Sequence, residues 1–164
     1  MTEATVHASA VLVGARAVLI RGPSGAGKSR LALELIEARR SGALRFARLV
    51  GDDRVHLERA GGRLLVRPAE TLSGLIELRG VGILRRDYEP CAVVGLVVDL
   101  TAADAERLPE IGQTSIDGIS LPRLAVAPGA TALPVVMAVV TSCGVISVDK
   151  ATFSAIPSSV LAID

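Results

Sequence analysis

The chain has 164 residues, of which 50% are hydrophobic and 21% are charged. This length and balance indicate one compact domain over residues 1–164 and exclude a disordered segment or a simple coiled coil. The formal net charge is only +1, without the basic excess typical of nucleic-acid binding, so we expect no nucleic-acid partner.

No part of the sequence predicts a membrane segment. Residues 1–7 contain an acid and no apolar stretch, and later apolar runs are broken by Gly, Pro or Asp well before the roughly 20 residues that a spanning helix needs. The two cysteines, Cys91 and Cys143, fit no metal-ligand or redox spacing. We therefore expect a soluble cytoplasmic protein with no membrane partner and with its cysteines buried as reduced thiols.

The first elements follow the order strand, strand, loop, helix. Two apolar runs, Val6–Val13 and Ala17–Arg21, flank a Gly-Ala pair and predict two strands with a tight connection. A glycine-rich segment follows the second run. From Lys28 to about Arg40 apolar residues recur at helical spacing, and Gly42 is a suitable stop.

The middle of the chain predicts mainly β structure. A short strand at residues 48–50 is followed by a β-hairpin that joins residues 55–59 to residues 63–67 through Gly-Gly. Residues 75–84 form an apolar stretch punctuated by glycines. The most hydrophobic strand covers residues 92–100.

Three segments complete the chain. Residues 101–119 are polar and poorly periodic, which predicts a mobile loop. Residues 121–126 predict a further strand. Residues 133–140 fit either a helix or a buried strand, because periodicity does not separate the two at this length.

The strongest functional motif lies between the second strand and the helix. It fits the pattern G-x-x-x-x-G-K-[ST] and comprises Gly22, Pro23, Ser24, Gly25, Ala26, Gly27, Lys28 and Ser29. A glycine-rich turn that opens a helix lets backbone N–H groups converge on an anion, which the helix dipole also favours. We expect Lys28 to reach the β- and γ-phosphates of a nucleotide and Ser29 to offer its hydroxyl to Mg²⁺.

Carboxylates that could complete such a site follow the next short strand. A nucleotide triphosphate binds with Mg²⁺, which needs a carboxylate, and Asp52 and Asp53 are the natural candidates. Adjacent residues point in different directions, so one can serve the metal while the other faces the reacting phosphate. The alternative is a pair of solvated turn aspartates.

Other ionisable residues are less specific. His7, in the first predicted strand, could assist proton transfer or only pack, and His56 fits a surface position. Glu77 is an acid in an apolar segment, where a lone charge is costly unless it meets a metal or a partner. The simpler alternative to a metal is a salt bridge with its chain neighbour Arg79. Asparagine is absent from the sequence, which excludes the N-K-x-D element of many GTPases and leaves adenine as the expected base.

Four stretches together resemble the catalytic domain of HPr kinase/phosphorylase. They are residues 6–7, the motif at residues 22–29, the segment Leu49–Val55 and the segment Ile76–Ile83, which reads I-E-L-R-G-V-G-I and is close to the family signature. The resemblance implies an α/β fold in which a phosphate-binding loop lies inside a mixed β core similar to that of phosphoenolpyruvate carboxykinase. It further implies a short form that lacks the amino-terminal domain of most members.

The resemblance also implies an activity and residue roles. Family members use ATP to phosphorylate a serine of the phosphocarrier protein HPr and remove that phosphate with inorganic phosphate, giving pyrophosphate. In these terms Ser29 and Asp53 with Glu77 serve Mg²⁺, and Asp52 with His7 serves proton transfer. Arg107 resembles an arginine that approaches the serine-bearing surface of HPr, and self-association is a further expectation.

Two other functions remain open from the sequence. One is a regulatory module that senses ATP without transferring phosphate, although the motif and its acids are retained together. The other is a small-metabolite kinase, for which a lid rich in arginines is expected, whereas residues 101–119 contain only one arginine.

Overall fold

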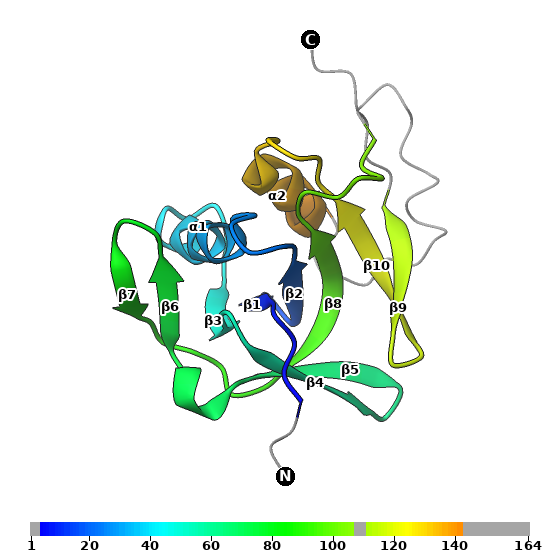
Figure 1. Ribbon diagram of the computed structural model, residues 1–164, viewed down its shortest axis with the longest axis horizontal. Coiled ribbons are helices and arrows are strands. Elements are labelled where there is room, and N and C mark those ends of the chain that lie inside the picture. Colours follow the sequence, from blue (N-terminus) through cyan, green and yellow to red (C-terminus); the bar gives the residue numbers. More distant parts are fainter. Residues whose placement is uncertain (1–3, 107–110, 143–164) are drawn as a thin grey trace.

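The computed structural model describes residues 4–106 and 111–142, and Figure 1 shows their arrangement. The elements, in chain order, are β1 (Ser9–Val13), β2 (Arg16–Arg21), α1 (Lys28–Arg40), β3 (Ala47–Gly51), β4 (Val55–Ala60), β5 (Arg63–Pro68), a 3-10 turn (Glu70–Leu72), β6 (Leu75–Leu78), β7 (Gly82–Arg85), β8 (Ala92–Asp99), β9 (Gly112–Ile116), β10 (Ile119–Ala125) and α2 (Ala132–Ser142).

The central feature is a mixed sheet of eight strands, six of which follow the order β3-β1-β2-β8-β10-β9. Strand β8 is parallel to both β2 and β10, whereas β1 is antiparallel to both β2 and β3. Strands β2, β3, β8 and β10 therefore run in the same direction. Because their carboxyl ends share one edge of the sheet, residues that follow these strands are brought together there.

Each face of the sheet is covered, which explains the high hydrophobic content of the strands. Along β2, Val18 and Ile20 face the helices α1 and α2, while Ala17 and Leu19 face the opposite side. In Figure 1 the two helices lie above the sheet and the β4–β5 hairpin lies below it. The hairpin joins the sheet through β5, which pairs with β8.

Most predicted elements are confirmed. The first two strands, the helix at residues 28–40, the Gly-Gly hairpin and the most hydrophobic strand all form, and the ambiguous segment near residue 136 is helical. The apolar stretch at residues 75–84 is a separate hairpin, β6–β7. The predicted loop at residues 101–119 is wrong in part, because β9 forms an edge strand there.

Two smaller expectations are also corrected. His7 lies in a bend before β1 rather than in the first strand. Cys91 is exposed instead of buried because it precedes β8 at the surface, and Cys143 lies outside the described residues. In residues 4–106 and 111–142 neither helix has the length and apolar character needed to cross a bilayer.

Candidate phosphate-binding and phosphotransfer site

The loop at residues 22–29 connects β2 to α1 and is shaped as an anion cradle. Gly25 and Gly27 have φ values of 83° and 96°, a left-handed conformation that glycine adopts without steric cost. Gly27 is the N-cap of α1, and no side chain forms a capping hydrogen bond there. The first N–H groups of the helix are therefore left for an external acceptor such as a phosphate.

The ammonium of Lys28 lies across this loop. Its Nζ donates to the carbonyl oxygens of Gly22 at 2.9 Å and Pro23 at 3.0 Å. Burial lowers the pKa of Lys28, and the negative charges of Asp53 and Asp52 oppose that effect. A partly desolvated ammonium with two weak neutral acceptors is well suited to exchange them for phosphate oxygens.

Asp52 is the buried carboxylate of the site. The Ser29 hydroxyl shares its proton between the two carboxylate oxygens at 2.8 and 2.9 Å, and the Ser9 hydroxyl donates at 2.6 Å. The backbone N–H of Glu77 donates a further bond at 3.1 Å. Only 2% of Asp52 is exposed. The carboxylate is therefore fixed against the hydroxyl of the phosphate loop.

Asp53 has a different partner from Asp52. Its φ is 66°, a left-handed conformation that aspartate tolerates better than most residues. Its carboxylate lies 3.1 Å from Nε2 of His7, and about half of the Asp53 side chain is exposed. The reversal of direction between the two aspartates thus gives one buried and one accessible carboxylate.

The contacts of the two aspartates differ from the grouping that the resemblance implies. The resemblance groups Ser29 with Asp53 at Mg²⁺ and His7 with Asp52 in proton transfer, whereas in the structure Ser29 contacts Asp52 and His7 contacts Asp53. Glu77 contributes its backbone N–H to Asp52, and its side chain is exposed. The cause is the tight turn after β3, in which Arg54 N–H bonds to the carbonyl of Asp52 at 2.8 Å and turns Asp53 outward.

The sequence did not single out Arg79 as a site residue, although the structure brings it to the phosphate loop. An ideal Cβ placed on Gly25 would lie 3.4 Å from Nη2 of Arg79, so the guanidinium rests directly against the loop. Arg79 occupies the turn between β6 and β7. Arg79 belongs to the stretch I-E-L-R-G-V-G-I, which the sequence did mark as a motif. Its contact with the phosphate loop depends on the packing of the β6–β7 hairpin against α1, which the sequence does not reveal.

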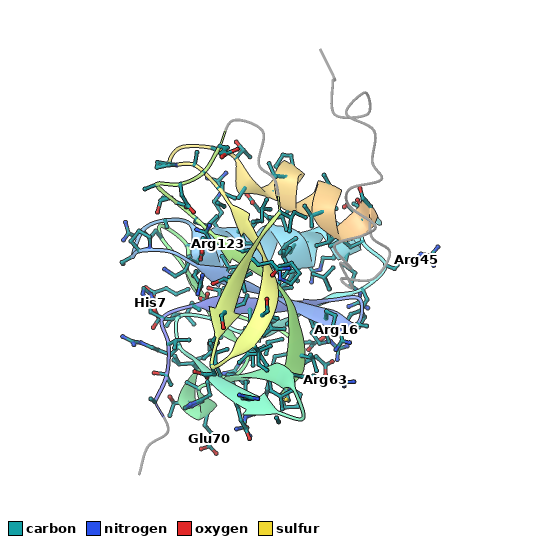
Figure 2. All side chains as sticks on the ribbon, turned by 90° about the vertical axis from the view of Figure 1, so that its right-hand side faces the viewer. His7, Arg16, Arg45, Arg63, Glu70 and Arg123 are labelled. Carbon is teal, nitrogen blue, oxygen red and sulfur yellow. The ribbon has the colours of Figure 1, made fainter. Side chains whose placement is uncertain are left out.

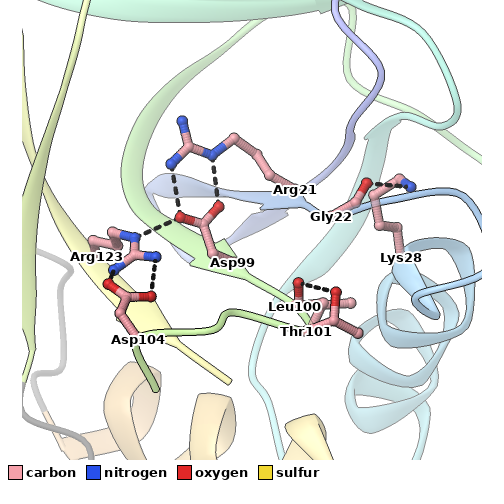
Figure 3. Close-up of polar contacts among 8 residues, drawn as sticks. All are labelled: Arg21, Gly22, Lys28, Asp99, Leu100, Thr101, Asp104 and Arg123. Atoms are coloured by element: carbon pink, nitrogen blue, oxygen red, sulfur yellow. Dashed lines mark hydrogen bonds and ion pairs between the residues drawn. The ribbon is translucent and has the colours of Figure 1, made fainter. Parts of the chain in front are cut away.

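A second polar network borders the loop on the β8 side (Figure 3). Arg21, the last residue of β2, donates to Asp99 at 2.7 and 2.8 Å, and Arg123 of β10 donates to the same carboxylate at 2.5 Å. Arg123 also donates twice to Asp104. The carboxylate of Asp99 thus links the ends of three neighbouring strands beside the loop.

The residues fit a Mg-nucleotide. Ser29 and Asp52 are in hydrogen-bond contact, and a hydroxyl and a carboxylate are the side-chain types that hold Mg²⁺ in phosphate-loop enzymes. Within the described ranges no three His, Cys, Asp or Glu side chains gather as a metal site.

Comparison with known proteins identifies the family of the chain. The family model described as the HPr Serine kinase C-terminal domain matches residues 1–143. The chain belongs to this family. It is 46% identical over 81 residues to HPr kinase/phosphorylase of Streptococcus thermophilus, covering 49% of this chain and 24% of that protein. It is 42% identical over 101 residues to HPr kinase/phosphorylase of Lactococcus lactis, covering 61% of this chain and 30% of that protein.

A solved structure supports the fold. Hpr(Ser) kinase/phosphatase from Coxiella burnetii matches with a TM-score of 0.68 at 24% identity, covering 87% of this chain and 91% of that chain. The matches to the two curated relatives span less than a third of those proteins' length. The family is one of HPr kinase/phosphorylase enzymes, and the mixed α/β fold of this chain is that of a member.

Proposed function

We propose that this chain uses ATP to phosphorylate a serine of HPr and catalyses the reverse, phosphate-dependent removal of that phosphate with release of pyrophosphate. The observation that carries this proposal is that two adjacent carboxylates have different partners. Asp52 accepts a hydrogen bond from Ser29, and Asp53 lies beside His7. A site that only binds ATP needs the first pair. The second pair adds an accessible group that can accept a proton.

The phosphates are proposed to bind along residues 22–29, with Lys28 exchanging its two carbonyl contacts for β- and γ-phosphate oxygens. Ser29 and Asp52 would hold Mg²⁺, which supplies charge neutralisation at the phosphates. Arg79, resting on Gly25, would add a second positive charge at the loop. We also infer that the β core resembles that of phosphoenolpyruvate carboxykinase.

In the forward direction the serine hydroxyl of HPr attacks the γ-phosphorus. A bond forms between the serine oxygen and phosphorus, the bond to the β-phosphate oxygen breaks, and ADP leaves. Asp53 takes the serine proton, and His7 at 3.1 Å holds that carboxylate in place. In the reverse direction phosphate attacks phosphoserine, pyrophosphate forms, and Asp53 returns the proton to the serine oxygen.

Arg107, the residue expected to approach HPr, lies outside the described residues. Its role therefore stays a prediction. Replacement by Ala should slow transfer to HPr with little change in ATP affinity.

The test is incubation of the purified chain with Mg-ATP and purified HPr, followed by intact-mass measurement of HPr. The expected result is a mass gain of one phosphoryl group on HPr that depends on both Mg²⁺ and Lys28. ATP binding without any mass gain would replace the kinase by an ATP-sensing module. A mass gain that persists after Lys28→Ala would exclude the phosphate loop as the donor site.

A further inference from the structure

Four arginines surround a small cavity at the end of α1 that is far from the phosphate loop. They are Arg39 and Arg40 in the last turn of α1, Arg48 on β3 and Arg86 after β7, and we call them the arginine cluster. The cavity has a volume of about 70 Å³. Because α1 has 13 residues, its two ends are separated by about 18 Å, so this cavity is separate from the nucleotide site.

The hydrogen bonds of the cluster are incomplete. The Nε–H groups of Arg48 and Arg86 are buried and have no acceptor in the described part of the chain. Buried donors are nearly always satisfied in folded proteins, so two orphaned donors beside one cavity need an explanation. An acceptor bound inside the cavity would explain them, because a small rotation of each guanidinium would let its Nε–H group donate to that acceptor.

The acids around the cluster do not neutralise it. Glu37 is shared, since it lies 3.5 Å from Arg40 and 3.8 Å from Arg86. Glu89 pairs with Arg48 at 2.8 Å. Asp87 is the one acid that lines the cavity. Three carboxylates therefore face four guanidinium groups, and the cluster keeps an excess of positive charge.

The dipole of α1 explains only part of this arrangement. Positive side chains in the last turn of a helix compensate its exposed carbonyl groups, which accounts for Arg39 and Arg40. Arg48 and Arg86 come from a strand and a loop and carry the orphaned donors. Arg48 also pairs with Glu89 and lies over the ring of Phe46 at 5.5 Å, and Arg86 lies 3.8 Å from Glu37. These contacts hold both side chains at the cavity but leave the two Nε–H groups without an acceptor in the described part of the chain.

The chemistry of the lining selects an anion with several acceptor oxygens. A guanidinium presents planar pairs of donors that match phosphate or carboxylate oxygens. A cavity of about 70 Å³ is several times larger than the space that holds one water. Its lining contains four guanidinium groups, which donate hydrogen bonds, and one carboxylate, which accepts them. We propose that the arginine cluster binds a phosphate-sized oxyanion, either inorganic phosphate or the phosphoryl end of a small phosphomonoester.

The test uses the full chain with Lys28→Ala, so that the phosphate loop contributes little, and needs neither HPr nor turnover. Inorganic phosphate is titrated at constant ionic strength while Tm and the heat of binding are measured. We expect saturable binding of one phosphate per chain. Adding Arg48→Gln and Arg86→Gln should weaken this binding at least tenfold.

Arg45→Gln is the matched control, because Arg45, in the connection from α1 to β3, is an exposed arginine that does not line the cavity and projects away from the body of the molecule (Figure 2). It should leave phosphate affinity unchanged. Arg40→Gln is a second test variant in case the double variant does not fold. Arg40 has only a 3.5 Å contact with Glu37 and its side chain is 70% exposed, so its replacement should not disturb folding. It should weaken phosphate binding several-fold with little change in Tm of the free protein.

A parallel titration with glycerol 3-phosphate identifies the source of the anion. Equal binding assigns the site to the phosphoryl end of an ester, and binding of inorganic phosphate alone assigns it to the free ion. The proposal is overturned if Lys28→Ala alone abolishes phosphate binding, if the double variant binds as well as its parent, or if chloride reproduces the response.

Discussion

Arg21 and Asp99 lie opposite each other in the parallel ladder of β2 and β8, and their side chains form two hydrogen bonds of 2.7 and 2.8 Å. Arg21 is the residue immediately before the phosphate loop. Asp99 is followed by Leu100, whose Cβ and carbonyl lie within 3.2 Å of an ideal Cβ on Gly22. The ion pair therefore fixes both strands at the point where the loop leaves the sheet.

The first prediction concerns this carboxylate. Burial would raise the pKa of Asp99, but the hydrogen bonds and charges of Arg21 and Arg123 outweigh that effect, and the pKa is lowered. Asp99→Asn should cost on the order of 2 kcal/mol at pH 7, the range of charged hydrogen bonds in partly buried sites. Urea unfolding of both proteins measures the loss.

The pH dependence follows from the direction of that shift. A carboxyl whose pKa is lower in the folded state stabilises the protein above its unfolded pKa of about 3.9 and loses this effect as the pH falls through the folded value. The difference between wild type and Asp99→Asn should be full at pH 7 and shrink below about pH 4. Asp104→Asn is the matched control, since Asp104 bonds to the same arginine but is exposed, and it should change stability far less.

The second prediction concerns Gly51 at the end of β3. An ideal Cβ there would lie 2.7 Å from Cγ1 of Val55 and 3.1 Å from Cα of Pro68. Gly51→Ala should therefore lower the free energy of unfolding by about 1–3 kcal/mol through overpacking. Gly112→Ala is the control, because its nearest neighbour is a carbonyl at 3.9 Å. Equal stability of the two variants would show that β3 can shift without cost.

The elements that follow a strong local pattern were predictable from the sequence. Leu31 and Leu35 recur one turn apart and are buried in α1, so helical periodicity was enough. Strand β9 was missed because it lies at the sheet edge with most of its residues at least partly exposed, and such a strand needs no alternation of apolar residues. Residues 75–84 were predicted only as one apolar stretch punctuated by glycines, and the turn that divides them into β6 and β7 was not recognised.

The position of the two aspartates beside the phosphate loop was predictable, but their contacts were not. Local sequence places Asp52 and Asp53 after β3 and therefore at the edge that carries the phosphate loop. Which of them meets Ser29 depends on the φ of 66° at Asp53 and on donors from Ser9 and Glu77, which come from distant parts of the chain. No spacing rule contains these tertiary contacts.

The third prediction tests the phosphate loop. Lys28→Ala should weaken MgATP binding by about 10- to 100-fold, because it removes a charge-assisted contact worth about 1.5–3 kcal/mol. Calorimetric titration measures the affinity. Arg30→Ala removes an exposed cation from the same helix turn, where it pairs with Glu34, and should have little effect. If both variants bind MgATP as the wild type does, Lys28 does not contact the phosphates.

The last prediction separates the two aspartates. Asp53→Asn removes the accessible carboxylate and keeps a residue type that tolerates its left-handed backbone. It should reduce phosphorylation of HPr by about 10²- to 10⁴-fold, the usual contribution of general acid–base catalysis, while MgATP affinity stays close to wild type. Asp52→Asn removes the partner of Ser29 instead, and should weaken Mg-dependent ATP binding.

Two assays on each variant distinguish these roles. Intact mass follows phosphorylation of HPr, and pyrophosphate release from serine-phosphorylated HPr follows the reverse reaction. Because the same group must take the serine proton in one direction and return it in the other, Asp53→Asn should slow both reactions by similar factors. Loss of one direction alone would mean that two groups divide the proton transfer, with His7 as the second. If Asp52→Asn stops chemistry at unchanged MgATP affinity while Asp53→Asn stays active, the buried carboxylate is the base, and the hydrogen bonds from Ser9, Ser29 and Glu77 must then open during turnover.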